Sequence, residues 1–161
     1  MNHPGFTLRE AAPADLSAIL GLIRALAEYE KLAHECQATE ADLGAALFGT
    51  PARAHAVLAE SQGEAIGLAL WFYNFSTFTG RPGIYLEDLF VQPTQRGRGI
   101  GRALFRYLAQ RALAEGCARL EWSVLDWNEP AIRFYRAIGA TGLDEWTVQR
   151  LSGPALHALA A

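Results

Sequence analysis

The most informative part of the sequence is Tyr85-Leu86-Glu87-Asp88-Leu89-Phe90-Val91 followed, after residues 92–95, by Arg96-Gly97-Arg98-Gly99-Ile100-Gly101. The first predicts a strand, because apolar residues surround its two carboxylates. The second is a Gly-rich loop that leads into a helix, since Ile100, Leu104 and Leu108 recur at helical spacing. A strand joined to a helix N-terminus through glycines offers free backbone N–H groups and the positive end of a helix dipole. The junction therefore predicts a phosphate or pyrophosphate site.

The two common nucleotide-binding loops do not fit this junction. The dinucleotide fingerprint needs a small third residue where this chain has Arg102, and the Gly-Lys-Ser/Thr of the Walker loop is absent. The glycines still allow a ligand to approach the backbone closely, and Arg96 and Arg98 add positive charge. On these residues alone, a glycine-rich turn without a ligand is the alternative interpretation.

Outward from this junction, the chain shows further strand and helix patterns. Upstream, we expect a strand at 6–10, a helix that opens at Pro13 and fades near residue 30, and a second helix from Thr39 to 48. A hairpin follows, with strands at 54–60 and 65–75 around a turn at 61–63, and then the strand 83–91. Downstream, we expect a long helix that ends before Gly116, a strand at 118–125, a short helix at 128–139, a last strand at 141–151 and a final turn or helix after Ser152.

This order predicts an α+β fold in which helices flank a central mixed, mostly antiparallel sheet of about six to seven strands. The 161 residues, 51% of them hydrophobic and 19% charged, fit one soluble domain, residues 1–161. The formal net charge of −3 disfavours nucleic acid as a partner. The chain has no apolar run long enough for a membrane span and no secretory pattern at its start, so we expect no membrane association. The two cysteines are isolated and the four histidines lack metal-ligand spacing, which favours the cytoplasm and no metal.

Several motifs together resemble one enzyme superfamily. Arg96-x-x-Gly99-x-Gly101 is similar to the pyrophosphate loop of the GNAT N-acetyltransferases, and Asn128-Glu129-Pro130-Ala131 followed by Tyr135 is similar to their fourth motif. Tyr85-Leu86-Glu87-Asp88 and Trp127-Asn128-Glu129-Pro130 look most like the diamine branch, which comprises spermidine/spermine and thialysine acetyltransferases. The resemblance implies a GNAT-type fold, acetyl-CoA as cosubstrate, a small-molecule amine as acceptor and a homodimer.

The resemblance also implies which residues hold acetyl-CoA. The end of the strand would meet the pantetheine arm, the Gly-rich loop would hold the pyrophosphate, and the fourth motif would lie beside the pantetheine and the sulfur. The residues expected to bind the cofactor are Leu89, Phe90, Val91, Arg96, Gly97, Arg98, Gly99, Ile100, Gly101, Arg102, Asn128, Glu129, Pro130, Ala131 and Tyr135.

Acetyl transfer to an amine needs a base, because a free alkylammonium has a pKa of about 10.4 and must lose a proton before it attacks. Glu87 is the candidate, directly or through a water, since a carboxylate inside an apolar strand is costly without a purpose. Adjacent Asp88 should face the other side of the sheet unless a bulge redirects one of the two. A structural carboxylate, hydrogen-bonded or paired with an arginine, is the alternative for both.

The departing thiolate needs an acid. By resemblance Tyr135 lies beside the sulfur of coenzyme A and can supply that proton. The alternative is a core aromatic, but Phe134 and Ile138, four residues apart, already form a packing face.

Carboxylates and aromatic faces also suit an alkylammonium chain. The positions that align with the acceptor side of the diamine branch are Tyr29, Glu30, Glu87, Asp88, Glu121, Trp122, Ser123 and Asp144. Two alternatives stay open: a different acceptor, such as an amino acid, an aminoglycoside or a protein amine, and an acetyl-CoA-binding module without catalysis. The presence of both Glu87 and Tyr135 favours an enzyme.

Overall fold

The computed structural model describes residues 2–161, which divide into two compact units. The first unit ends at Leu125 and contains a sheet with three α-helices, and the second is Asp126–Ala161. Each unit is described by itself.

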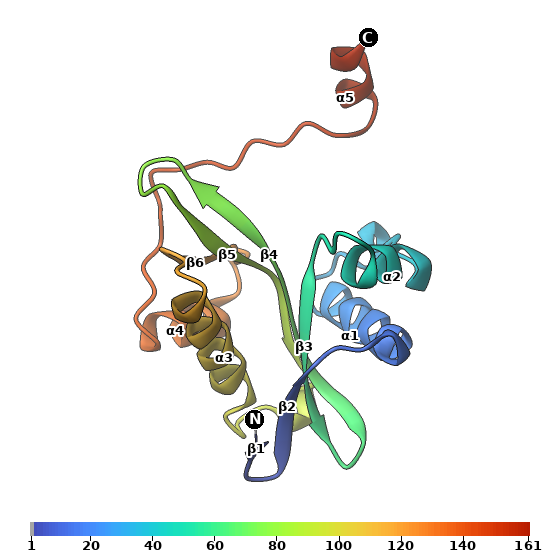
Figure 1. The fold of residues 1–161 in the computed structure, drawn as a ribbon, viewed down its shortest axis with the longest axis vertical. Coiled ribbons are helices and arrows are strands. Elements are labelled where there is room, and N and C mark those ends of the chain that lie inside the picture. Colours follow the sequence, from blue (N-terminus) through green and yellow to red (C-terminus); the bar gives the residue numbers. More distant parts are fainter. Residues whose placement is uncertain (1) are drawn as a thin grey trace. The chain divides into compact units, whose positions relative to one another are not determined.

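The sheet of the first unit has six strands among the described residues, and they follow one another in sequence order. Neighbours from β1 to β5 pair antiparallel, and β6 pairs parallel with β5. This mixed, mostly antiparallel sheet with flanking helices confirms the predicted fold class (Figure 1). The strands are β1 (Asn2–His3), β2 (Phe6–Glu10), β3 (His55–Ser61), β4 (Glu64–Ser76), β5 (Arg81–Val91) and β6 (Leu120–Trp122).

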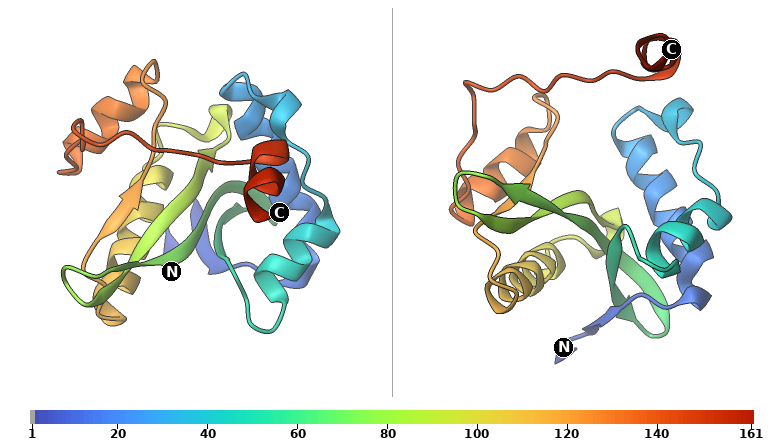
Figure 2. Two further views of the ribbon diagram at one scale, coloured as in Figure 1. Left: turned by 90° about the horizontal axis from the view of Figure 1, so that it is seen from above. Right: turned by 45° about the horizontal axis from the view of Figure 1, so that its top comes forward.

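Helices cover both faces of this sheet. α1 (Leu16–Tyr29) and α2 (Glu40–Phe48) lie together on one face, and α3 (Ile100–Ala114) lies on the other (Figures 1 and 2). α2 begins where the sequence predicts, because Thr39 and Asp42 form a capping box that satisfies free N–H groups. Leu58, Leu68 and Leu70 of the sheet pack with α1 and α2. On the opposite face, Ile100, Leu104 and Leu108 of α3 are buried, as their helical spacing predicts.

One irregularity in the sheet changes the directions of the side chains of β5. Trp71 of β4 lies opposite Leu86, but its neighbour Leu70 lies opposite Asp88, so Glu87 is an extra residue on β5. Residues directly opposite each other in an antiparallel pair share a face of the sheet. Leu70 packs with α1 and α2, so the bulge turns Asp88 toward the α1 face and away from the side of Leu86.

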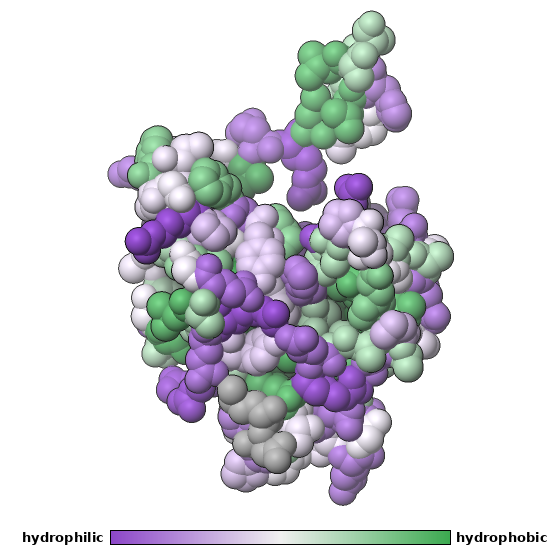
Figure 3. Space-filling model, viewed as in Figure 1, coloured by the Kyte–Doolittle hydropathy of each residue, from purple (hydrophilic) through white to green (hydrophobic). Residues whose placement is uncertain are grey.

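The second unit contains α4 (Glu129–Ala137) and α5 (Gly153–Ala160). The strand expected at 141–151 is wrong: these residues form no strand and pair with no other segment. Trp146 and Val148 are two residues apart, as apolar residues on one face of a strand would be, yet both are exposed. An alternating pattern shows that a segment could form a strand, but a strand also needs a neighbour with which to pair. α5 is apolar, as the green atoms over it in Figure 3 show.

The strand predicted at 118–125 is also shorter than expected. β6 covers only residues 120–122, and they pair with residues 84–86 of β5. Beyond Leu86 the two strands are no longer hydrogen-bonded. This early end of the pairing leaves a sheet edge beside the Gly-rich loop.

Candidate active site

The Gly-rich loop has the backbone that its glycines predict. Gly97 and Gly99 have φ values of 79° and 81°, in the left-handed region that side-chain-bearing residues rarely adopt. Gly99 is also the N-cap of α3, whose first residue Ile100 is fully buried and fixes the start of the helix. No atom lies within 4 Å of where a Cβ on either glycine would be. The loop therefore presents open space at a helix N-terminus, which fits a diphosphate.

Two loop arginines are held by the protein itself. Arg96 donates from Nε to the carbonyl of Val91 at 3.1 Å, and its guanidinium lies 4.7 Å from the ring centre of Tyr29. Arg98 donates from Nη2 to the carbonyl of Gly5 at 2.9 Å and from Nη1 to Oε1 of Gln95. Arg96 thus joins the loop to the end of α1, and Arg98 joins it to the turn between β1 and β2. Arg102, in the first turn of α3, is exposed.

The edge of β5 leads directly into this loop. After Leu86, residues 87–91 have β4 on one side and no described strand on the other. Phe90 and Val91 are buried, and Leu89 is half-buried. Such an edge has backbone groups available for an extended ligand, which fits the predicted place of the pantetheine arm.

Three carboxylates lie together at the bulge. The pKa of Asp88 is raised to about 6, first by burial and then by repulsion from Glu87 and Glu30. Burial also raises the pKa of Glu30, which caps the C-terminus of α1, whereas Glu87 is exposed. None of the ion pairs among the described residues includes any of the three. We call Glu30, Glu87 and Asp88 the unpaired acidic cluster.

The other acceptor-side candidates of the first unit lie on β6 and have partners inside the protein. Glu121 accepts from Nδ2 of Asn74 at 2.8 Å and pairs with Arg119 at 2.7 Å. Ser123 shares a hydrogen bond of 2.7 Å with the hydroxyl of Tyr85. Trp122 packs edge-on against Phe105 of α3, with ring centres 4.8 Å apart. The structure therefore gives these three side chains contacts within the protein, and their role on the acceptor side stays a prediction.

The remaining candidates belong to the second unit. Asn128 caps α4 and accepts from the amide of Ala131 at 3.4 Å, while Glu129 and Pro130 form the first turn. Tyr135 is half-buried on the same helix, with its ring 5.7 Å from that of Phe134. Asp144 is exposed in the irregular segment after the helix. The fourth motif thus has the capped helix expected of it, and the roles of these residues stay predictions.

Sequence reasoning missed one contact of the loop and one contact of the turn that the loop meets. The carbonyl of Gly5 accepts from both Arg98 and the hydroxyl of Ser61, at 2.9 and 2.8 Å. Pro4-Gly5 between two strand-forming stretches is a turn signal that could have pointed to this hairpin. Nothing in the local sequence indicates that its turn meets the loop, because 93 positions separate Gly5 from Arg98.

Neither a metal centre nor a membrane span emerges from the described part of the chain. No group of three or more His, Cys, Asp or Glu side chains in residues 2–161 could hold a metal ion. No described helix is long and apolar enough to cross a membrane.

The loop, the open strand edge and the capped helix can now be compared with known proteins. Residues 20–140 match the acetyltransferase (GNAT) family. The chain belongs to the GNAT acetyltransferase family. Thialysine N-epsilon-acetyltransferase of Bos taurus is 42% identical over 164 aligned residues, which cover 95% of this chain and 96% of that protein. L-ornithine N5-acetyltransferase of Arabidopsis thaliana is 30% identical, with 94% of this chain and 86% of that protein covered.

A solved structure shares the whole GNAT architecture. An integron cassette protein from the mobile metagenome of V. cholerae superposes with a TM-score of 0.81 and 28% identity, covering 97% of this chain and 98% of that one. The family match spans both compact units, since it runs from α1 to the end of α4. The protein is thus a GNAT enzyme that transfers acetyl groups, and its family uses acetyl-CoA as cosubstrate.

Proposed function

We propose that this enzyme transfers the acetyl group of acetyl-CoA to the primary amine of a small, lysine-like molecule, such as thialysine, ornithine or a polyamine. The observation that carries the proposal is the unpaired acidic cluster, in which Asp88 and Glu30 are half-buried and no ion pair of residues 2–161 includes any of the three carboxylates. An alkylammonium group supplies that missing charge. Tyr29, beside Glu30 on the same helix end, stays a predicted acceptor-side residue, and the guanidinium of Arg96 lies 4.7 Å from its ring centre.

The relatives support the same class of acceptor. Thialysine N-epsilon-acetyltransferase and L-ornithine N5-acetyltransferase are named for acetylation of a side-chain amine of an amino acid. A spermidine/spermine N(1)-acetyltransferase-like protein of Homo sapiens is 30% identical over 86% of this chain. A flexible aliphatic amine is common to these names.

The Gly-rich loop and the open edge of β5 suit the diphosphate and the pantetheine arm of coenzyme A. We assign the diphosphate to the loop amides of residues 97–102 and the pantetheine arm to the open edge at 89–91, with Asn128–Ala131 near the arm. The left-handed glycines without neighbouring atoms support this assignment. When bound, acetyl-CoA supplies an activated acetyl thioester.

For the base, two carboxylates compete. Glu87 is exposed at the bulge, where a substrate amine or a bridging water can reach it, and it is our first candidate. Asp88 is the second, because its pKa of about 6 lets the carboxylate take up a proton near neutral pH. Whichever of the two carboxylates is the base would remove the proton from the acceptor ammonium before the amine attacks. The other carboxylate would attract the ammonium into the site.

For the acid, we propose the hydroxyl of Tyr135, which would give its proton to the departing sulfur. Tyr135 follows the capped start of α4, so a short rigid helix fixes its position within the second unit. Replacing Tyr135 by Phe should lower kcat about 10- to 100-fold while the Kd for acetyl-CoA stays unchanged. An unchanged kcat would remove Tyr135 from the mechanism.

The experiment that tests the function is thiol release from acetyl-CoA with a panel of amines. Thialysine, ornithine, lysine, putrescine and spermidine should be substrates, whereas an aminoglycoside and a peptide with a free N-terminus should react much more slowly. Titration calorimetry with coenzyme A separates the alternatives. Binding without turnover of any amine would indicate a non-catalytic module, and absence of binding would overturn the assignment.

Three further proposals accompany the function. We propose that residues 1–161 act as one catalytic domain, which the family match across both units supports. We also propose a homodimer, as the resemblance to the diamine branch implies. The third proposal is that the enzyme is located in the cytoplasm, with which its two free cysteines agree.

A further inference from the structure

The turn between β1 and β2 meets the Gly-rich loop through a single acceptor. The carbonyl of Gly5 receives two hydrogen bonds, from Nη2 of Arg98 at 2.9 Å and from Oγ of Ser61 at 2.8 Å. Three segments far apart in the sequence therefore converge on one oxygen: the first hairpin, the end of β3 and the loop before α3. Because the guanidinium is charged, its hydrogen bond is of the stronger kind.

The position of Arg98 within the loop gives this contact its importance. Arg98 lies between Gly97 and Gly99, the two residues with left-handed backbone. Glycines on both sides make the loop costly to order, since glycine loses more conformational freedom than any other residue. The side chain of Arg98, which stands between the two glycines, donates hydrogen bonds to Gly5 and Gln95.

We propose that the β1–β2 turn is part of the cofactor-binding apparatus: the Gly5 carbonyl holds Arg98, and Arg98 thereby fixes the loop amides in the conformation that receives the diphosphate. Arg98 is then a positioning residue, and its own charge is secondary. The inference rests on the proposed role of the loop. A loop ordered before the ligand arrives binds more tightly, because the ordering cost is not subtracted from the binding free energy.

Gly5 offers a sharp way to test this contact. It has a φ of 84°, and a Cβ on it would lie 2.7 Å from Nη2 of Arg98, too close for both to stay. Gly5→Ala therefore displaces the guanidinium without changing any residue of the loop. A Cβ at this positive φ also strains the turn, which the control variant below shares. Arg98→Ala removes the same contact from the other side. Gly63→Ala is the matched control, because Gly63 has a φ of 79° in the neighbouring hairpin turn and no atom within 4 Å of its Cβ position.

The experiment measures the Kd for coenzyme A and the kinetic constants of the wild type, the three single variants and the Gly5→Ala/Arg98→Ala double variant. Gly5→Ala and Arg98→Ala should each weaken binding about three- to tenfold, and the double variant no further, since both remove one contact. The effect should raise KM for acetyl-CoA, not KM for the amine, and binding of pantetheine, which lacks the diphosphate, should not change. Gly63→Ala should bind as the wild type does.

Hydrogen exchange of the ligand-free protein gives a second readout that does not depend on binding. Amides of residues 97–101 should exchange faster in Gly5→Ala and Arg98→Ala, but not in Gly63→Ala. A normal Kd in Gly5→Ala with weak binding in Arg98→Ala would overturn the inference, because Arg98 would then act on the diphosphate directly. Additive losses in the double variant would do the same. If the wild type itself does not bind coenzyme A, the proposed function is wrong. That result differs from those that overturn only the role of Gly5 and Arg98, in which the wild type binds.

Discussion

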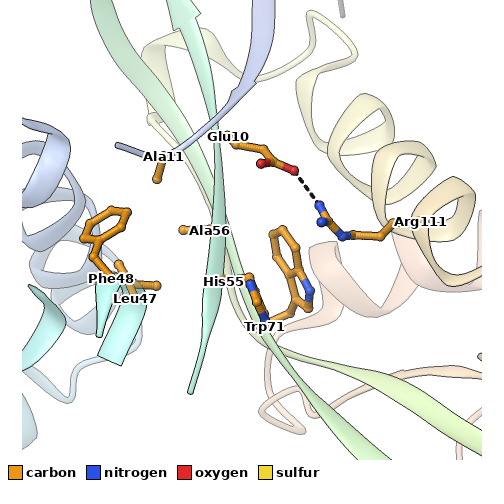
Figure 4. Close-up of a pocket in the computed structure, with 8 residues that line it drawn as sticks. All are labelled: Glu10, Ala11, Leu47, Phe48, His55, Ala56, Trp71 and Arg111. Atoms are coloured by element: carbon orange, nitrogen blue, oxygen red, sulfur yellow. Dashed lines mark hydrogen bonds and ion pairs between the residues drawn. The ribbon is translucent and has the colours of Figure 1, made fainter. Parts of the chain in front are cut away.

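Two groups of acidic residues in the first unit contrast in how their charge is compensated. At the C-terminal end of α3, Arg111 pairs with Glu10 of β2 at 2.6 Å, as Figure 4 shows. Arg111 also pairs with Glu115 at 3.0 Å. Arg111 also lies 5.3 Å from the ring centre of Trp71, and the hydroxyl of Tyr107 donates to Glu10 at 2.9 Å. In the part of the chain that the structure describes, no cation forms an ion pair with the unpaired acidic cluster, although Asp88 and Glu30 are partly buried.

The difference supports the proposal that the first group is structural and the second binds the substrate. Acids around Arg111 receive hydrogen bonds and opposite charge, so they contribute to the stability of the folded protein. The unpaired acidic cluster costs stability, because burial and mutual repulsion disfavour its charged form. Residues that oppose stability in this way are concentrated at functional sites, where a bound ligand can provide the compensating charge. The contrast therefore supports the bulge as the proposed site for the ammonium group of the substrate.

The largest test of this contrast is catalytic. Glu87→Gln and Asp88→Asn each remove one charge with little change in shape. The variant that lacks the base should have a kcat/KM about 10²- to 10⁴-fold below that of the wild type. The other variant should mainly have a higher KM for the amine, because the residue it lacks attracts the substrate and transfers no proton. Steady-state kinetics of both variants with one amine decides the assignment.

The pH dependence provides the cross-check on the base. If Asp88 is the base, kcat/KM should rise with pH through about 6, where its carboxyl loses its proton, and Asp88→Asn should remove that step. Glu10→Gln is the matched control from the paired group and should leave the profile unchanged. Two variants with wild-type kinetics would show that neither carboxylate is the base.

Most of the first unit follows from local sequence patterns. β2 matches the predicted strand, and α3 buries the residues whose spacing predicts it. The left-handed loop is likewise predictable, because glycine is the residue that tolerates such backbone. The residues expected to hold the diphosphate therefore come out at a helix N-terminus, as the sequence implies.

What the sequence misses depends on partners distant in the chain. The bulge at Glu87 is a matter of register between β4 and β5, and it decides which face Asp88 takes. By resemblance Glu121 aligns with the acceptor side, whereas its ion pair with Arg119 and its hydrogen bond from Asn74 become visible only in the fold. The pattern of Trp146 and Val148 predicts a strand, whereas the structure gives these residues no strand to pair with.

The second test concerns the paired group. Arg111→Met keeps an apolar stem of similar length but leaves Glu10, Glu115 and the Tyr107 hydroxyl without their cation. We expect the free energy of unfolding to fall by about 2 kcal/mol, a value below that of a fully buried pair because the group is partly exposed. Urea unfolding measures the loss, and kcat at saturating substrates should not change. A large loss of kcat without loss of stability would place this group in the active site.

The smallest expected effect is a gain in stability at the unpaired acidic cluster. In the folded protein the pKa of Asp88 is about 6, above its ordinary value of 3.8. Between these values the folded state binds more protons than the unfolded state, so the contribution of Asp88 to stability decreases as pH rises through this window. Asp88→Asn lacks this titration and should be more stable than the wild type by about 1–2 kcal/mol at pH 7.

The pH course makes that gain specific to Asp88. Below about pH 4 the carboxyl is protonated in both states, and the variant and the wild type should be nearly equally stable. The difference should grow between about pH 4 and pH 6 and then level off. Thermal or urea unfolding at several pH values measures it, with Glu10→Gln as the control, which should be less stable than the wild type at pH 7 because it loses a partner of Arg111. A difference independent of pH, or a loss of stability in Asp88→Asn, would mean that a cation compensates Asp88 in the folded protein, and the contrast between the two acidic groups would then disappear.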